Sequence, residues 1–237
     1  MRDLIESFLK FVPQYLSNLI DITLSPKRFF FLRKLDSENA LHEALKFFLF
    51  TFAFDRLWRL GILEIKDRLL VEHAQDIAIH LLVILISAVV VKVSWRIVGG
   101  KANIRSLLAA SMYYSSVALL IDGFFKFFNV LVLMLYEPRL KEHTAKGDLN
   151  GAAEIISSIP PTGNLIASLF SLLGMLFLTI WFISFWGVFR TINEAGRLKS
   201  FAAACICVTL TLFSMWIGFF IFLGNAGQFS TLRFFLR

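Results

Sequence analysis

The sequence predicts an all-α integral membrane protein, a polytopic bundle of about five transmembrane helices preceded by an amphipathic helix at the membrane interface. Four apolar stretches, 77–93, 106–136, 164–189 and 200–224, are long enough for a bilayer core of about 30 Å, which takes roughly 20 helical residues. Lipid offers no partner for backbone hydrogen bonds, so such stretches must be helical. Charged residues make up 17% of the chain, whereas about 25% is usual for soluble proteins.

The first 22 residues predict the amphipathic helix. Its apolar residues follow the i, i+3, i+4, i+7 spacing of one helical face, and polar side chains fill the opposite face. The apolar set is Leu4, Ile5, Phe8, Leu9, Val12, Tyr15, Leu16, Leu19 and Ile20. Because the polar face has mixed charge, we expect this helix to pack on the membrane domain or on a neighbouring subunit. Pro13 is expected to kink or split it.

A membrane-interface anchor is predicted directly after this helix. Proline marks a turn or helix start here, and three phenylalanines are bracketed by basic residues. We expect the rings to lie in the acyl boundary and the cations at the lipid headgroups. The predicted anchor comprises Pro26, Lys27, Arg28, Phe29, Phe30, Phe31 and Arg33.

The segment 44–63 is a fifth candidate span, and the distribution of basic residues decides whether it crosses. With five spans and the N-terminus inside, the inner segments 1–39, 92–105 and 190–199 carry 13 Lys and Arg, against 7 in the outer segments. Without this crossing the bias disappears. The positive-inside rule therefore predicts a cytoplasmic N-terminus and an outside C-terminus. The expected organisation is a cytoplasmic interfacial segment 1–39, a membrane domain 40–224 and a short tail 225–237. The expected spans are about 44–63, 77–96, 106–136, 164–189 and 200–224.

The stretch 106–136 is too long for one simple crossing and too short for two. As a single helix it measures roughly 46 Å at 1.5 Å per residue. We therefore expect one tilted or kinked helix, softened around Gly123, that extends beyond the membrane. The polar loop 137–162 ends in Pro160 and Pro161, which predict a break before the next span.

Three sequence elements resemble the Yip-type membrane-protein family, which is named for interaction with Ypt/Rab GTPases and is also widespread in bacteria. The first is Leu24-Ser25-Pro26-Lys27-Arg28-Phe29-Phe30, similar to the family's proline-plus-aromatic segment before the first span. The second is Gly99-Gly100-Lys101-Ala102-Asn103-Ile104-Arg105-Ser106-Leu107-Leu108 followed by Tyr113-Tyr114-Ser115. The third is Asn193-Glu194-Ala195-Gly196-Arg197-Leu198-Lys199, placed like the short polar turn before the last span. Together they cover roughly residues 24–224.

The resemblance implies five spans with a cytoplasmic N-terminus, in agreement with the charge count, and it does not imply an enzyme. We expect a non-enzymatic membrane scaffold or organiser, in the bacterial cytoplasmic (inner) membrane, that contacts the lipid bilayer and assembles as a homo-oligomer. Residues 1–39 would present a surface for a cytoplasmic protein partner. No cofactor and no nucleic-acid partner are expected.

The strongest candidate for a functional pair is Asp122 with Lys126, in the middle of an apolar stretch. Ionisable groups at this depth cost about 2.5 kcal/mol or more and normally pair or face water. Their spacing of four places both on one helical face. One interpretation is an internal ion pair near Gly123, or a pair on a protruding helix. The alternative is the charged lining of an ion pathway in a homo-oligomeric channel or membrane-perturbing effector. Lys126 binding a lipid headgroup is a further possibility.

Other polar clusters have ordinary structural interpretations. Gly99, Gly100, Lys101 and Arg105 predict a basic cytoplasmic turn that touches headgroups, because the spacing of a phosphate-binding loop is absent. Residues of metal-binding type also share one side of a helix entering the second span, but a solvated turn explains them; they are Glu72, His73, Asp76 and His80. Asp55 and Arg59 are expected to form a structural pair. No motif for catalysis occurs, and no metal site is predicted.

Overall fold

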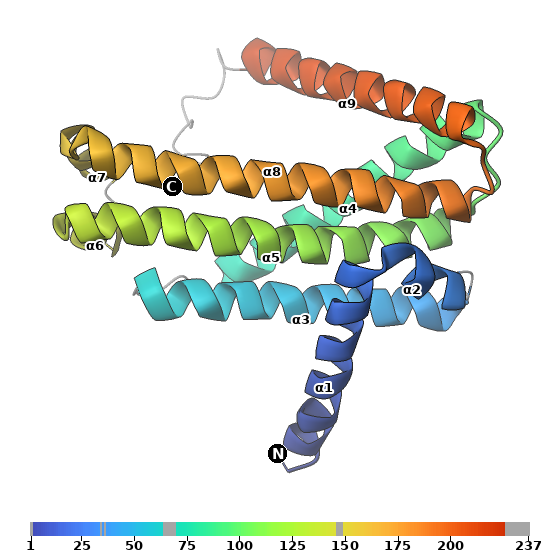
Figure 1. Ribbon diagram of the computed structural model, residues 1–237, viewed down its shortest axis with the longest axis horizontal. Coiled ribbons are helices and arrows are strands. Elements are labelled where there is room, and N and C mark those ends of the chain that lie inside the picture. The colour runs from blue at the N-terminus through green and yellow to red at the C-terminus, as the bar shows by residue number, and fades with distance from the viewer. Residues whose placement is uncertain (1, 34, 36, 64–69, 146–148, 226–237) are drawn as a thin grey trace.

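The computed structural model describes residues 2–33, 35, 37–63, 70–145 and 149–225. In these ranges the chain is helical, without strands, as the sequence predicts (Figure 1). The helices are α1 (Arg2–Leu24), α2 (Pro26–Leu32), α3 (Glu38–Leu63), α4 (Leu70–Ile97), α5 (Ile104–Tyr136), α6 (Arg139–Ala145), α7 (Leu149–Ser158), α8 (Pro161–Ile192) and α9 (Arg197–Asn225).

The long helix α5 lies at the centre of the bundle. Helices α3 and α8 run beside it on opposite sides, and α4 crosses it obliquely. The last helix, α9, packs on α4, while α1 leaves the bundle at a steep angle to the parallel helices (Figure 1). The connections between α4 and α5 and between α8 and α9 lie at the same end of the bundle as α2.

Four helical segments in the described ranges are long and apolar enough to cross a membrane. They are His73–Ile97, Ile104–Tyr136, Pro161–Ile192 and Arg197–Ser214. Large apolar side chains such as Leu82, Leu172 and Leu212 are exposed on their outer surfaces. Water does not favour so many exposed apolar side chains, and the four helices therefore fit an integral membrane protein. Helix α3, which contains the predicted span 44–63, is not among the four.

Helix α5 is continuous over 33 residues, so the prediction of one helix for 106–136 is confirmed. The side chain of Asn103 caps its start by accepting a hydrogen bond from the Ser106 backbone N–H at 2.7 Å. At its other end the Glu137 carboxylate accepts two hydrogen bonds from the Arg139 guanidinium, at 2.8 and 2.9 Å. These bonds lower the pKa of the Glu137 carboxyl group and raise that of Arg139.

Two sequence expectations differ from the structure. Helix α1 continues through Pro13 and is not split there. Pro13 is exposed, so water can satisfy the backbone carbonyl that proline leaves without a donor. The segment 137–162 contains α6 and α7 in place of a plain polar loop. The expected break at Pro160 and Pro161 is confirmed, because α8 begins at Pro161.

Aromatic side chains dominate the core between α2, α3, α5 and α8. Tyr113 of α5 is almost fully buried, and the Phe47 ring of α3 lies 5.1 Å from it. On the other side of α5, Trp181 stacks on Tyr114, and the Trp181 indole N–H donates a hydrogen bond to the Tyr114 carbonyl at 3.2 Å. Tilted and edge-on ring contacts each add about 0.5–1.5 kcal/mol beyond burial alone. Aromatic packing is therefore a main cohesive force of this bundle.

Glycine is needed at two successive positions in the turn between α4 and α5. Gly99 has a φ of 83°, a conformation that other residues rarely adopt. The Gly100 N–H donates to the Trp95 carbonyl at 2.7 Å. A Cβ at Gly100 would lie 2.5 Å from the Asn193 Oδ1 atom and 2.9 Å from the Trp95 carbonyl oxygen. The turn is therefore too tight for any side chain at Gly100.

Replacing Gly100 with alanine should lower the free energy of unfolding by about 1–3 kcal/mol, because the added methyl group forces the two turns apart. Thermal unfolding of the purified protein in detergent measures the effect. Gly196→Ala is the matched control in the neighbouring turn, since a Cβ there meets no atom within 4 Å. Equal stability of the two variants would contradict this packing.

Candidate functional site

The three family-like sequence elements come together at one end of the bundle. We call this end, formed by α2, the α4–α5 turn and the α8–α9 turn, the basic end (Figure 1). It gathers many of the basic residues that the charge count assigns to the cytoplasmic side, including Lys27, Arg28, Arg33, Arg96, Lys101, Arg105, Arg197 and Lys199. The local charge is therefore suited to contact with anionic headgroups.

Direct polar contacts join the two turns of the basic end. The buried Asn193 side chain accepts a hydrogen bond from the Ala102 N–H at 3.2 Å and donates one to the Phe189 carbonyl at 2.8 Å. Lys101 and Glu194 form an exposed ion pair at 2.9 Å, which adds little stability by itself. The Lys92 ammonium group donates to the Ala102 carbonyl. The turns therefore form one connected surface.

The three phenylalanines of the predicted anchor have different environments. Phe29 and Phe30 are 6% and 5% exposed, and both rings contact Tyr113 edge-on at 5.3 and 5.6 Å. Phe31 is 79% exposed. Successive residues on a helix point about 100° apart, so Phe29 and Phe30 face the bundle while Phe31 faces away from it. The prediction that all three rings reach the acyl boundary therefore suits Phe31 alone.

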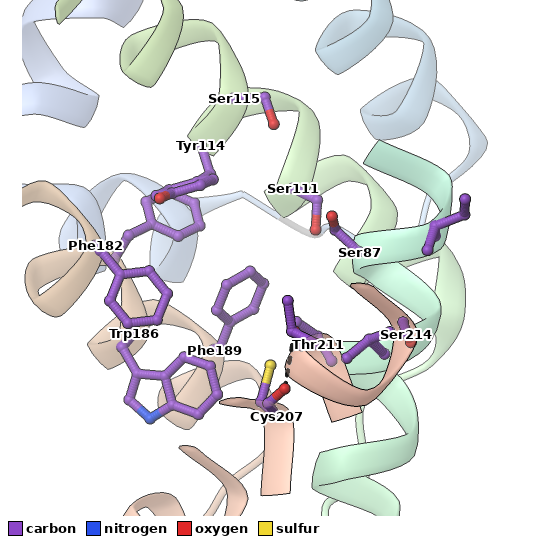
Figure 2. Close-up of a pocket in the computed structure, with 14 residues that line it drawn as sticks. Ser87, Ser111, Tyr114, Ser115, Phe182, Trp186, Phe189, Cys207, Thr211 and Ser214 are labelled. Atoms are coloured by element: carbon purple, nitrogen blue, oxygen red, sulfur yellow. Dashed lines mark hydrogen bonds between the residues drawn. The ribbon is translucent and has the colours of Figure 1, made fainter. Parts of the chain in front are cut away.

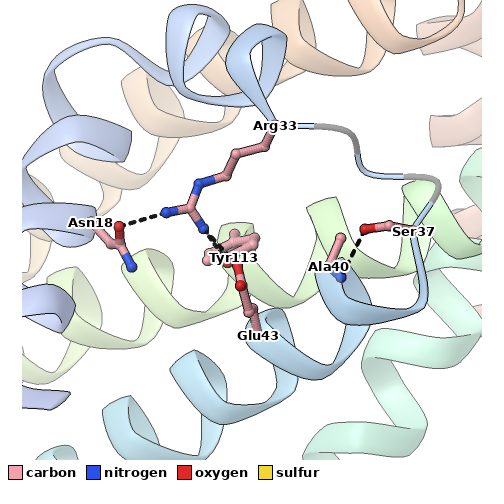
Figure 3. A network of polar contacts seen from close by, with 6 residues as sticks. All are labelled: Asn18, Arg33, Ser37, Ala40, Glu43 and Tyr113. Atoms are coloured by element: carbon pink, nitrogen blue, oxygen red, sulfur yellow. Dashed lines mark hydrogen bonds and ion pairs between the residues drawn. The ribbon is translucent and has the colours of Figure 1, made fainter.

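Arg33 connects the N-terminal helices to the bundle (Figure 3). Its guanidinium donates hydrogen bonds to the Tyr113 hydroxyl at 3.2 Å, the Glu43 carboxylate at 3.1 Å and the side-chain amide oxygen of Asn18 at 2.7 Å. It also lies over the Phe29 ring at 4.3 Å. One side chain thus joins α1, α3 and α5, although the sequence analysis assigned it to lipid headgroups.

Helix α1 packs on α3 through Tyr15. Its ring lies 4.7 Å from Phe47 and 4.4 Å from Phe50, and its hydroxyl forms a 2.9 Å hydrogen bond with Thr51. Burial raises the pKa of the Tyr15 hydroxyl, although the hydrogen bond with Thr51 opposes the shift. The side chains of the predicted residues Leu4, Ile5, Phe8 and Leu9 lie outside the described part of the chain.

Five large apolar side chains of α1 and α2 face outward. We call Leu16, Ile20, Leu24, Phe31 and Leu32 the interfacial patch; all five are exposed. The patch is attached to the basic end, where α1 runs at a steep angle to the parallel helices (Figure 1). A helix in this orientation lies along a membrane surface when the bundle spans the bilayer.

Asp122 and Lys126 pair with each other within α5. The ammonium nitrogen lies 2.8 Å from a carboxylate oxygen, and 33% of the Asp122 side chain and 64% of the Lys126 side chain are exposed. Pairing cancels the two charges locally and lowers the cost of placing them at membrane depth. This is the geometry expected of an internal ion pair.

The charged cluster near the start of α4 also forms contacts between helices. Asp76 pairs with Arg56 of α3 at 3.1 Å, and the His80 ring nitrogen contacts the Asp76 carbonyl at 2.7 Å. The side chains of Glu72 and Arg59 lie outside the described residues, so the pair of Asp55 with Arg59 stays a prediction. No group of three metal-ligating side chains occurs in the part of the chain that the structure describes.

A cavity of about 400 Å³ lies between α4, α5, α8 and α9 (Figure 2). Its apolar walls include Phe182, Phe185, Trp186 and Phe189 of α8 together with aliphatic residues of α4. Six residues with hydroxyl groups and one thiol also line it; they are Ser87, Ser111, Tyr114, Ser115, Cys207, Thr211 and Ser214. Its size and mixed lining are typical of a site for a small amphipathic ligand.

Two features of this region were missed by sequence reasoning. The Arg33–Tyr113 contact joins residues 80 positions apart, and no local pattern indicates such a pair. The cavity is lined by serines and one threonine from three helices, each of which has an ordinary role in a membrane helix. The spacing of Cys207, Thr211 and Ser214 along one face of α9 is the local signal from which a polar stripe could have been predicted.

Comparison of the chain with known protein families, with curated proteins and with solved structures gives no match.

Replacing Arg33 with glutamine should release the N-terminal helices from the bundle. We expect a loss of roughly 2 kcal/mol, because Tyr113 and Glu43 both lose a charged hydrogen-bond donor. Amide hydrogen exchange of residues 12–33 should then be about thirtyfold faster if it follows local opening. Hydrogen-exchange mass spectrometry measures this. The control is Arg28→Gln on the same helix, where the side chain is exposed; identical exchange in both variants would contradict the role of Arg33.

Proposed function

We propose that this chain is a non-enzymatic integral membrane scaffold of the Yip type, built from five spans with a cytoplasmic N-terminus. The observation that carries the proposal is the docking of α1 and α2. Arg33, Phe29 and Phe30 fasten them to the bundle, whereas the interfacial patch faces outward. Apolar side chains next to a basic surface suit insertion into one leaflet.

The fifth span of this proposal is α3. It runs beside α5 (Figure 1), and its buried face carries Ala44, Phe47, Phe48 and Phe52 together with two polar residues, Thr51 and Asp55. A partner helix that crosses the membrane can shield the polar residues of α3 from lipid. The cytoplasmic side is then the basic end, in agreement with the positive-inside rule.

A labelling experiment distinguishes five spans from four. In a Cys205→Ala/Cys207→Ala background, Ser37→Cys precedes α3 and Lys66→Cys follows it. With five spans, a membrane-impermeant maleimide should label these two positions from opposite sides of sealed vesicles. Lys101→Cys and Thr162→Cys provide reference points for the two sides. Labelling of positions 37 and 66 from the same side would show that α3 does not cross.

The scaffold mechanism follows from the rigid attachment of the interfacial patch. Insertion of Phe31 and Leu32 into the cytoplasmic leaflet displaces lipid on one side of the membrane, while the bundle fixes the position of the insertion. The exposed apolar surfaces of α8 and α9 offer contacts for copies of the same chain, which supports a homo-oligomer. The outer surface of α1 is available to a cytoplasmic protein partner, in the bacterial inner membrane that the resemblance indicates.

Replacing Phe31 and Leu32 with serine tests the insertion. Trypsin cleaves after Lys27, Arg28 and Arg33, and insertion should protect these bonds in liposomes. Because two large apolar side chains lose their burial in lipid, cleavage should be about tenfold faster or more. Thermal unfolding should change little, since both side chains are already exposed. Leu57→Ser, on the exposed surface of α3, is the matched control, and unchanged trypsin protection in the double variant would refute the mechanism.

The same liposomes test the channel alternative, which rests on the paired charges Asp122 and Lys126 of α5. Their mutual pairing at 2.8 Å within one helix favours a structural role. The scaffold proposal expects no ion flux from the intact protein. Flux whose ion preference changes in Asp122→Ala or Lys126→Ala would instead make this protein a channel.

A further inference from the structure

The cavity opens at membrane depth. Its walls come from α4, α5, α8 and α9, which are the four helices long and apolar enough to cross a bilayer. Residues of its lining such as Ile86, Phe182 and Thr211 are exposed on the outer surface of these helices. A surface exposed at this depth faces lipid or another membrane helix, because no water is present there.

The lining suits a hydrocarbon chain. In Figure 2, Phe182, Trp186 and Phe189 of α8 form one wall, while Ser87 of α4 and Ser111 of α5 lie on the opposite side. The hydroxyl groups of α9 already have hydrogen-bond acceptors in their own helix. Thr211 donates to the Cys207 carbonyl at 2.8 Å, and Ser214 donates to the Leu210 carbonyl at 2.8 Å. Thr211 and Ser214 therefore contact a ligand in the cavity mainly through their carbon atoms.

The shape also suits a chain. The residues of α9 that line the cavity extend from Cys207 to Ser214, which is roughly 10 Å along the helix. Nearer the basic end, Trp186 and Phe189 line the cavity; the Trp186 indole N–H donates to the Ser200 hydroxyl at 3.1 Å, and its ring stacks on Trp95 at 5.5 Å. Tryptophan favours the boundary between headgroups and acyl chains, so the cavity begins just below that boundary.

Two cations lie at the boundary above the cavity. Arg197 and Lys199, in the first turn of α9, are exposed, and neither has an ion-pair partner within the part of the chain that is described. They precede Ser200, which lies on the same face of α9 as Cys207 and Thr211. Because residues two positions apart point to different sides of a helix, Arg197 and Lys199 lie on either side of the α9 face that carries Ser200, and each can bring a positive charge worth about 1 kcal/mol to a phosphate group at this level.

We propose that the cavity binds one acyl chain of an anionic glycerophospholipid from the cytoplasmic leaflet, with the headgroup phosphate at Arg197 and Lys199. The hydroxyl groups of Ser87 and Ser111, which have no hydrogen-bond partner among the described residues, can donate to an oxygen of the lipid. The bound lipid then fills the space between α4, α8 and α9 and becomes part of the bundle. This site is separate from the interfacial patch, and its assignment to the cytoplasmic leaflet rests on the orientation proposed above.

Photo-crosslinking in nanodiscs tests this site. The full-length protein is placed in phosphatidylcholine with a small fraction of phosphatidylglycerol that carries a diazirine in its acyl chain. Crosslinks should concentrate in residues 182–189 and 207–214. Thr211→Trp fills the cavity and should lower this labelling about tenfold, the change expected when about two methylene groups lose their burial. Leu212→Trp adds the same ring to the neighbouring exposed position and should not lower it.

The headgroup is tested by competition. Unlabelled phosphatidylglycerol should displace the probe at about a tenfold lower concentration than phosphatidylcholine, and Arg197→Gln/Lys199→Gln should remove this preference. Equal competition by the two lipids would overturn the anionic assignment, and stronger competition by a free fatty acid would overturn the glycerophospholipid. Labelling that is equal over all exposed positions, or unchanged in Thr211→Trp, would overturn the site itself. Crosslinks between two copies through the cavity walls would assign it to a second chain instead.

Discussion

Burial of Tyr113 is the constraint on which the arrangement of the basic end depends. The ring lies among Phe29 and Phe30 of α2 and Phe47 of α3, while its hydroxyl accepts a hydrogen bond from Arg33. Segments distant in sequence therefore bury its apolar ring and also provide a hydrogen-bond partner for its hydroxyl group. Without this contact, α2 would lose its position on the bundle and α1 would lose its fixed direction. The orientation of the interfacial patch therefore depends on Tyr113, a residue of α5.

Several hydroxyl groups of the bundle are satisfied locally, as expected in a medium without water. Ser94, Ser116 and Thr179 each donate to the carbonyl four residues earlier in their own helix. Where two helices share a polar contact, it is short and specific: the Asn129 amide of α5 donates to the Ala167 carbonyl of α8 at 2.7 Å. Few hydrogen bonds between helices therefore fix the orientation of one helix relative to another. Aromatic ring packing fixes most of these orientations.

Much of the fold could be predicted from the sequence because the relevant signals are local. Apolar length located the five long helices α3, α4, α5, α8 and α9, although α3 and α4 begin six and seven residues before their predicted boundaries, which is about two turns. The single helix at 106–136 followed from length alone. Charge counting assigned the basic segments to one side, and the structure places them at one end.

The candidate site was less predictable because it depends on contacts between distant residues. Phe29, Phe30 and Phe31 are chemically identical, and only the direction of α2 separates the buried rings from the exposed one. The sequence around Arg33 predicts contact with lipid headgroups, because no local pattern indicates that its partner is Tyr113, 80 positions away. Sequence spacing gave the pairing of Asp122 with Lys126, since both lie on one helix. The cavity required the relative placement of four helices, which no single-sequence pattern contains.

Helix α9 is attached to the bundle unevenly along its length, and this has a mechanical consequence. Its first turn is fixed by the bonds between Trp186 and Ser200. Farther along, Thr209, Thr211 and Ser214 bond to their own helix, and Leu212, Phe213 and Trp216 are exposed. A change in bilayer thickness acts on a helix by changing its tilt. Thinning of the membrane should therefore swing α9 about its first turn before it disturbs α5 and α8, so this helix is the part of the molecule most responsive to membrane thickness.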